Sequence, residues 1–238
     1  MSSYAKKAQN PNNFIVFDFE TGGLNNNKSA VTEIALIAID GGTGEKIIEY
    51  SSLISPYSND IEYNEKALEV TGISMEMLNE EGKDIKTVAT EVIEVFQKTN
   101  NRKERSAGLK PILVGHNVQF DLGFLHHLIH RGLGGTVEQT QKTLEQVLHG
   151  TRDYYGHFQP TYLDTWALCK SWLQDEKELP NYKLSTVVEK LGIDINNAHR
   201  AMNDVISTTE VLRVWLTAMR NGLNSNSLRR ERKYQFPM

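Results

Sequence analysis

The chain has 238 residues, of which 39% are hydrophobic and 24% are charged, and its only cysteine is Cys169. This composition is typical of a soluble globular protein, and one cysteine excludes an internal disulfide framework and a cysteine-built zinc site. No apolar run approaches the roughly 18–20 residues that span a bilayer, and no apolar stretch follows Lys6 and Lys7 as it would in a secretory signal. We therefore expect a cytoplasmic protein with no membrane partner.

The formal net charge is −4, which argues against a passive nucleic-acid binder. The charge is unevenly distributed, because residues 199–238 contain seven Lys or Arg and three Asp or Glu. An acidic body with a basic end suits a metal-dependent enzyme that acts on a phosphate-containing substrate.

The hydrophobic pattern predicts strands first and then an alternation of strands and helices. Strands are predicted at 13–20, 31–40, 46–54, 111–115 and 161–163, and helices at about 62–70, 84–98, 119–130, 136–148, from 164, 183–191 and 199–219. The glycine-rich stretch 40–44 is expected to form the turn of a hairpin. Residues 1–12 are expected to be disordered, and 221–238 to form a flexible basic tail. This order predicts one α/β or α+β domain around a mixed sheet.

Two acidic residues occupy an unusual place at the end of the first predicted strand. Because side chains alternate along a strand, Asp18 and Glu20 share a face with Phe14 and Val16. Two carboxylates at this spacing repel one another and resist desolvation. One interpretation is that the strand end emerges into solvent. The other is a site for a divalent cation, whose charge removes the repulsion.

Two further aspartates lie on apolar faces of predicted helices. Asp204 falls on a stripe with Ala201, Thr208 and Leu212, and Asp121 lies on the same side of its helix as Leu125. Asp204 alone is explained by a buried arginine or backbone partner, and Asp121 alone by the helix N-terminus. A shared metal site explains all four carboxylates at once, and two divalent ions there can activate water and stabilise the leaving oxygen of a phosphodiester.

His199 precedes Asp204 by five residues, a spacing that brings the two side chains together only if His199 lies in the loop or the first turn. Asn196 and Asn197 favour a helix start at that point. The two interpretations of His199 are an exposed loop histidine and a general base.

Three segments resemble the exonuclease motifs of the DEDDh (DnaQ-like) family, which includes the proofreading epsilon-type exonucleases, ribonuclease T and the TREX enzymes. They are Asp-Phe-Glu-Thr-Gly-Gly-Leu (18–24), His-Asn-Val-Gln-Phe-Asp (116–121) and Ala-His-Arg-Ala-Met-Asn-Asp (198–204). The tyrosine variant of the family would have Tyr at position 200, where this chain has Arg200. The resemblance therefore indicates the histidine type and covers residues 13–220.

The resemblance implies an RNase H-like fold, a central mixed five-stranded sheet flanked by helices, and 3'→5' hydrolysis that releases nucleoside 5'-monophosphates with two Mg2+ or Mn2+ ions. Asp18, Glu20 and Asp204 match ligands of the tighter ion. Asp18 would bridge to the second ion, Asp121 would act directly or through water, and His199 matches the general base. The implied substrate-binding residues are Thr21, Gly22, Leu24, Asn117 and Phe120, with Leu24 as an apolar wedge against the last base.

Residues 132–160 are longer than the usual connection in the family and are expected to be an insert. This segment or the basic tail is a candidate surface for a polymerase or another partner. Residues 67–73 resemble a segment of the epsilon-type branch, which favours DNA. The leading hypothesis is therefore an exonuclease that acts on single-stranded DNA ends, in proofreading or repair. An exoribonuclease of the ribonuclease T or oligoribonuclease type, and a polymerase-associated subunit that acts mainly through partner binding, remain alternatives.

Overall fold

The computed structural model describes residues 12–100, 109–174, 179–193 and 200–220. Expectations for residues 1–11, for His199 and for the tail 221–238 lie outside the described residues. The strands are β1 (Phe14–Thr21), β2 (Val31–Ile39), β3 (Lys46–Leu53), β4 (Ile112–Gly115), β5 (Gly150–Arg152), β6 (Phe158–Pro160) and β7 (Tyr162–Asp164). The helices are α1 (Glu65–Thr71), α2 (Met75–Glu81), α3 (Ile85–Lys98), α4 (Gln119–Leu133), α5 (Val137–Val147), α6 (Thr165–Trp172), α7 (Leu184–Lys190) and α8 (Ala201–Arg220).

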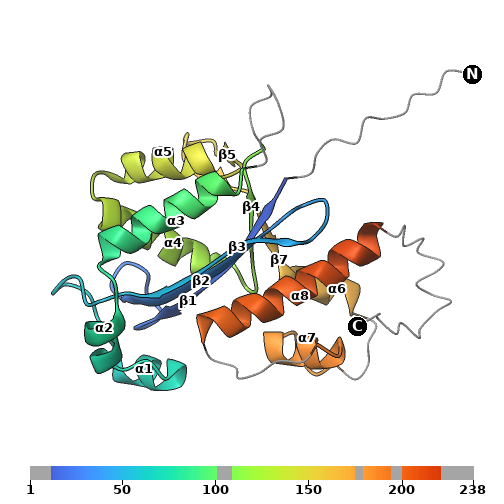
Figure 1. Cartoon of the computed structure of the whole chain (residues 1–238), viewed down its shortest axis with the longest axis horizontal. Coiled ribbons are helices and arrows are strands. Elements are labelled where there is room, and N and C mark those ends of the chain that lie inside the picture. Colours follow the sequence, from blue (N-terminus) through green and yellow to red (C-terminus); the bar gives the residue numbers. More distant parts are fainter. Residues whose placement is uncertain (1–11, 101–108, 175–178, 194–199, 221–238) are drawn as a thin grey trace, which may run out of the picture.

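Five strands form the central sheet in the order β3-β2-β1-β4-β7. β2 runs antiparallel to β1 and β3, whereas β4 runs parallel to β1 and β7. The layer of α3, α4 and α5 lies on one side of the sheet, and α8, with α6 and α7 beside it, lies on the other (Figure 1). The prediction of a mixed five-stranded sheet flanked by helices is confirmed.

The alternation of side chains along β1 divides the core into two layers. Ile15, Phe17 and Phe19 pack in the core beneath α3 and α4. Phe14 and Val16 pack with residues of α8 on the opposite face. Asp18 and Glu20 continue this second face, so the strand directs both carboxylates toward α8.

β1 extends beyond its parallel neighbour. β4 pairs with β1 only from Phe14 to Val16, whereas β2 pairs with β1 as far as Thr21. The last residues of β1 therefore have a strand neighbour on one edge only. The other edge is open to the first turn of α4, which follows β4 in the chain.

Residues 132–160 contain the end of α4, α5 and a hairpin formed by β5 and β6. α5 confirms the predicted helix, and a capping box between Thr136 and Gln139 explains where it begins. The hairpin was not predicted, because strands of three residues each are too short to show a period of two. The prediction that this region is an insert stays a prediction.

α2 was also missed by the sequence analysis, which had one helix at about 62–70. The structure has α1 in this region and α2 shortly after it. A side-chain cap opens each helix, Asn64 for α1 and Ser74 for α2. The left-handed backbone of Gly72 (φ 66°) ends α1 and makes the break between the two helices.

The two largest helices on the α3–α4 side cross closely at Gly132. A β-carbon added to Gly132 would lie 2.4 Å from the Ala89 Cβ and 2.6 Å from the Ile85 carbonyl oxygen. Only a glycine at this position of α4 allows α3 to approach so closely.

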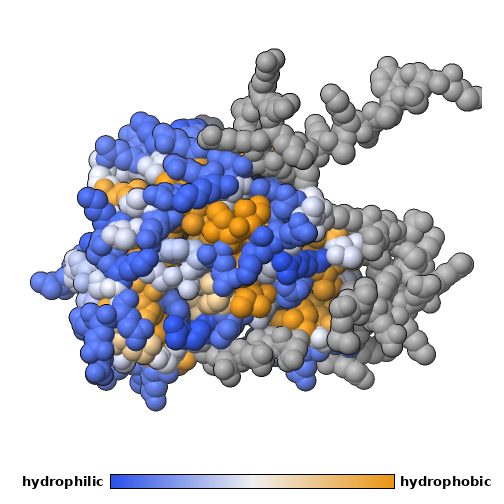
Figure 2. All heavy atoms as spheres, in the orientation of Figure 1, coloured by the Kyte–Doolittle hydropathy of each residue, from blue (hydrophilic) through white to orange (hydrophobic). Residues whose placement is uncertain are grey.

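The face shown in Figure 2 is mostly hydrophilic, with apolar side chains near its middle, where β3 lies between α3 and α8 in Figure 1. β3 is an edge strand, and an ion pair between Lys46 and Glu49 lies on it. Charged side chains on an edge strand discourage pairing with another chain. Among the described residues, no helix combines the length and hydrophobicity that crossing a membrane requires.

Candidate active site

Three carboxylates meet at the open end of β1. Asp18 and Glu20 project from β1 and Asp204 from the first turn of α8, and one oxygen of each lies within 4.8 Å of the others. All three side chains are half-buried. Hard carboxylate oxygens at this spacing are a donor set for Mg2+ or Mn2+.

Asp121 approaches the same strand end from the other layer. It lies in the first turn of α4, is only 4% exposed, and its Oδ1 accepts a hydrogen bond of 3.3 Å from the Phe19 amide. This bond satisfies a β1 amide beyond the end of β4. Asp121 lies outside the group of three, but its charge raises the pKa of Asp18, so the two carboxylates are close.

The pKa values of the site are raised. Burial is the largest cause for Asp18, and the charges of Asp121, Asp204 and Glu20 raise its pKa further. Burial, then Asp204 and Glu33, raise the pKa of Glu20 to about 7. Burial raises the pKa of Asp121 to about 8 against the lowering effect of its backbone hydrogen bonds. Ionising the cluster is thus costly, and a bound cation would offset that cost.

Glu33 was missed by the sequence analysis. It is 4% exposed on β2, and its carboxylate accepts bonds of 3.0 and 2.9 Å from Arg200 Nε and Nη2. It also accepts a bond of 3.3 Å from the Ala201 amide. Glu33 therefore anchors the start of α8, and hence Asp204, to the sheet. The signal that could have revealed it is a single charged residue in a nine-residue strand whose other residues are uncharged and mostly apolar.

The loop after β1 carries three of the predicted substrate residues. Thr21 donates a bond of 2.7 Å from its hydroxyl to the Gly23 carbonyl. Gly22 donates its amide to Ala30 at 2.9 Å and accepts from the Asn64 amide at 2.8 Å. Leu24 is 87% exposed. The loop is thus fixed by backbone bonds while its leucine projects into solvent.

Asn117 and Phe120 lie on the other side of this loop, at the start of α4. Asn117 has a left-handed backbone (φ 65°), and its amide donates to Asp164 Oδ1 at 2.9 Å. Asp164 also caps α6 through the Trp166 amide, so one carboxylate holds both Asn117 and the start of α6. Phe120 packs against Phe124 with ring centroids 4.9 Å apart.

A hollow of about 430 Å³, the terminal-base hollow, lies between the loop and α4. Its lining includes Leu24 and Asn26 from the loop and Gln119, Phe120 and Phe124 from α4. Leu24 is exposed at this hollow, Phe120 is half-buried and Phe124 is buried, and an apolar and aromatic lining of this kind suits a stacked base.

A histidine of the second motif has a structural role. His116 Nδ1 lies 3.0 Å from Thr165 Oγ1, and its Nε2 lies 2.9 Å from the Tyr182 carbonyl oxygen. Burial lowers the pKa of His116. Both ring nitrogens of His116 have a partner. His116 therefore links the segment before α4 to the start of α6 and to the segment before α7.

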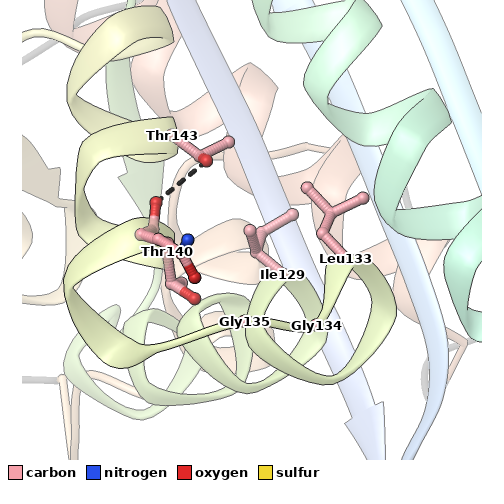
Figure 3. A pocket seen from close by; sticks show the side chains of 7 residues that line it. Ile129, Leu133, Gly134, Gly135, Thr140 and Thr143 are labelled. Carbon is pink, nitrogen blue, oxygen red and sulfur yellow. Dashed lines mark hydrogen bonds between the residues drawn. The ribbon is translucent and has the colours of Figure 1, made fainter.

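Another hollow, of about 350 Å³, lies at the corner between α4 and α5 (Figure 3). Ile129, Leu133 and Thr140 line it, and Thr143 donates to the Gln139 carbonyl at 3.0 Å. Of the residues that the structure describes, none with an acidic or basic side chain and none of the predicted site residues line this hollow.

Comparison with known proteins agrees with this geometry. The profile of the RNase_T family, described as an exonuclease family, matches residues 15–212. The chain belongs to this family. The DnaQ-like resemblance is confirmed, and the chain carries an exonuclease-type domain of the nuclease hydrolases.

The curated relatives include DNA polymerase III PolC-type from Thermotoga maritima, which is 33% identical over 198 residues, or 83% of this chain. The PolC-type protein of Bacillus subtilis is 27% identical over 199 residues. This chain spans 11% of the length of either relative.

Among solved structures, Escherichia coli exonuclease I in complex with a dT13 oligonucleotide superposes with a TM-score of 0.64 and 18% identity. The alignment covers 93% of this chain and 44% of that chain. Exonuclease I from Methylocaldum szegediense superposes with a TM-score of 0.63 and 21% identity, over 89% of this chain and 41% of that chain. These similarities confirm the RNase H-like fold.

Proposed function

We propose that this chain is a metal-dependent 3'→5' exonuclease that removes nucleoside 5'-monophosphates from the 3' end of single-stranded DNA. The observation that carries the proposal is the cluster of Asp18, Glu20 and Asp204, whose oxygens lie within 4.8 Å of one another. Membership of an exonuclease family supports the reaction class. The dT13 complex of exonuclease I supports single-stranded DNA as the substrate.

The proposed cofactor is a pair of divalent cations, Mg2+ or Mn2+, and the clustered carboxylates of Asp18, Glu20 and Asp204 support a cation site here. Two such ions supply an activated water and stabilise the leaving oxygen. Asp18, Glu20 and Asp204 would hold the tighter ion, and Asp18 would also face the second. Asp121 would contribute directly or through a water molecule.

The residues around the terminal-base hollow would position the 3' end. Leu24 and Phe120 would hold the last base between an apolar wedge and an aromatic ring, as the hollow between them suits. Thr21, Gly22 and Asn117 would face the terminal nucleotide. His199 would accept the proton of the attacking water, and its place in the chain just before α8 favours this role.

The proposal is tested by incubating 3'-ended oligonucleotides with the protein in Mg2+ or Mn2+ and analysing the products. We expect stepwise shortening of single-stranded DNA from the 3' end, release of 5'-monophosphates, and no reaction in EDTA. A 5'-labelled substrate reveals the direction, because 3'→5' attack gives a ladder of labelled products. Absence of cleavage, or full activity of Asp18→Ala, would contradict the proposal.

Matched RNA strands in the same experiment decide between DNA and the exoribonuclease alternative. Faster cleavage of RNA than of DNA would replace the proposed substrate. The His199→Ala variant tests the general base, because turnover should fall while Mn2+ binding is retained. Unchanged turnover would remove His199 from the mechanism.

The PolC-type relatives favour a second proposal, that the exonuclease works beside a DNA polymerase. The candidate surface in 132–160 is the β5–β6 hairpin, where Tyr154 is 96% exposed and Tyr155 is 79% exposed. Aromatic side chains of this exposure favour a protein partner. Gel filtration with the polymerase of the same organism tests this, with Tyr154→Ala and a chain lacking residues 221–238 to separate the two candidate surfaces.

A further inference from the structure

A second hollow continues from the terminal-base hollow along α4. It has a volume of about 470 Å³. Its lining includes Asn26 and Asn27 from the loop and His126, His130 and Arg131 from α4. We call it the upstream groove. Asn26 lines both hollows, so they adjoin. From Gln119 to Arg131 the helix rises about 18 Å, the length of roughly five stacked nucleotides.

The lining of the upstream groove is chemically suited to phosphate. It offers side-chain amides, imidazoles and one guanidinium, all of which donate hydrogen bonds. Among the described residues, no carboxylate belongs to the lining of this groove or of the terminal-base hollow, although the chain has 30 acidic residues and a net charge of −4. A polyanion bound in the two hollows would therefore not be repelled by a carboxylate of their lining.

The wall of the groove is built and fixed. His127 Nε2 lies 2.9 Å from the Tyr57 hydroxyl, which also accepts a bond of 3.0 Å from the Val31 amide. A β-carbon on Gly123 would lie 1.9 Å from Asn26 Nδ2, so the glycine lets Asn26 lie against α4. The loop is thus ordered before a ligand arrives, which reduces the entropy cost of binding.

The two histidines and the arginine all line the groove, and each has a neighbour that holds it in place. The rings of His126 and His130 stack with centroids 6.1 Å apart and an angle of 22° between planes. His130 Nδ1 pairs with Thr140 Oγ1 at 3.2 Å, so its Nε2 would meet a ligand. Arg131 uses Nη1 and Nη2 to bind Asp60 at 3.3 and 2.9 Å, and a guanidinium has five N–H donors in all.

We propose that the upstream groove binds the phosphodiester backbone of the substrate strand on the 5' side of its terminal nucleotides, through Arg131, His126 and His130. This inference rests on the proposed exonuclease function and adds the course of the strand beyond the 3' end. The affinity for the substrate should therefore increase with strand length and level off at about the number of nucleotides that α4 spans.

The test compares substrates of increasing length, from a one-nucleotide ester, thymidine 5'-(p-nitrophenyl phosphate), through dT2, dT4 and dT6 to dT12. For the wild type we expect KM to fall with length and to level off near five nucleotides. Arg131→Ala and His126→Ala should raise KM by about three- to tenfold on dT12 and least on the ester. In Arg131→Ala, which removes a cation, the salt dependence of dT12 binding should lose about 0.7 from its log–log slope.

Two control variants separate a phosphate contact from a loss of structure. Asp60→Asn removes the partner of Arg131 but keeps the guanidinium, so dT12 affinity should be retained or increased. Lys98→Ala removes an exposed cation of α3 that pairs with Glu94, outside both hollows, and should leave the length dependence as in wild type. Melting temperatures identify any variant that is misfolded.

An unchanged length dependence in Arg131→Ala and His126→Ala would overturn the groove proposal while leaving the exonuclease intact. If no substrate is cleaved at all, the proposed function fails instead. The groove is then tested by fluorescence anisotropy of labelled dT12, where equal affinity of wild type and both variants would overturn it.

Discussion

At the scale of single residues, the site is defined by carboxylates whose ionisation the fold makes costly. Asp18 projects from the end of β1 toward α8, and Asp121 reaches the same strand end from α4 in the opposite layer. Burial raises the pKa of both. Such clusters lower the stability of the metal-free protein and are retained where the chemistry needs them. Function and stability are therefore expected to change in opposite directions when one carboxylate is removed.

The variant Asp18→Asn tests this opposition. We expect exonuclease turnover to fall by about two to three orders of magnitude, as for other electrostatic groups of active sites. In EDTA at pH 8 the melting temperature should rise by about 3–6 °C, because the amide removes the repulsion between Asp18 and the neighbouring carboxylates. Glu94→Gln, an exposed carboxylate paired with Lys98, is the control and should change neither quantity. Lower metal-free stability of Asp18→Asn would contradict the electrostatic account.

The pKa values also predict how stability depends on pH. The pKa of Glu20 rises from 4.5 to about 7 and that of Asp121 from 3.8 to about 8. Between about pH 4 and pH 8 the folded chain therefore holds protons that the unfolded chain has released. The free energy of unfolding of the metal-free protein should fall as pH rises through this range. Urea unfolding in EDTA at pH 5, 6.5 and 8 measures it, and a rise from pH 5 to pH 8 would refute the prediction.

At the scale of residues, the sequence indicated site residues where a charged residue interrupted the apolar pattern of a strand. The period of two along β1 placed Asp18 and Glu20 on the face opposite Ile15 and Phe17, and this arrangement is confirmed. Glu33 broke the pattern of β2 in the same way, but its partner, Arg200, lies 167 residues further along the chain. Only the folded structure reveals that pairing.

At the scale of elements, the position of α8 depends on contacts at its first turn. Glu33 on β2 binds both the Arg200 side chain and the Ala201 amide. Asp204 lies one turn further along the helix. The ion pair therefore determines how far Asp204 stands from the carboxylates of β1.

Removing one partner of this pair should be more harmful than replacing both. Arg200→Met leaves Glu33, whose side chain is 5% exposed, without its ion pair and should lower the free energy of unfolding by about 1–3 kcal/mol. The double variant Glu33→Leu with Arg200→Met should recover part of that loss. Urea unfolding of the four proteins gives the coupling, and additive losses would contradict a direct pair.

The crossing of α3 and α4 gives a separate prediction. Gly132→Ala should destabilise the fold by about 1–3 kcal/mol, because the new methyl group would overlap Ala89 and the Ile85 carbonyl. Alanine's better helix propensity returns only about 1 kcal/mol. Lys142→Ala on the exposed side of α5 is the comparison and should stay within about 0.5 kcal/mol of wild type. A more stable Gly132→Ala protein would show that the helices can separate without cost.

Element order was predictable because long amphipathic helices and buried strands have strong periods. The stripe of α8 held from Ala201 to Leu212, which are both fully buried. Met219, near the end of α8, is 58% exposed, because the helix extends beyond the sheet that it covers. Short elements such as β5 carry too few residues for any period.

At the scale of the whole molecule, the proposed cations would join two layers of the fold. Asp18 and Glu20 belong to the central strand and Asp204 to the helix that covers one face of the sheet. A ligand that binds only the folded arrangement stabilises it by mass action.

Mg2+ should therefore stabilise the entire domain. At 100 times its dissociation constant the gain is about 2.7 kcal/mol, or about 5–11 °C in melting temperature for a domain of this size. Asp204→Asn should lose most of that gain. Hydrogen exchange should slow at the first turn of α8 when Mg2+ is added. An equal rise in melting temperature for wild type and Asp204→Asn would place the binding elsewhere.

The ligand cluster is assembled from opposite ends of the chain, and this has a consequence during protein synthesis. Asp18 is made early, but Asp204 is not joined to the growing polypeptide until 186 residues later. A ribosome-bound fragment that ends before α8 has two of the three clustered carboxylates. Nuclease activity would therefore be withheld from nascent chains until translation has passed the first turn of α8.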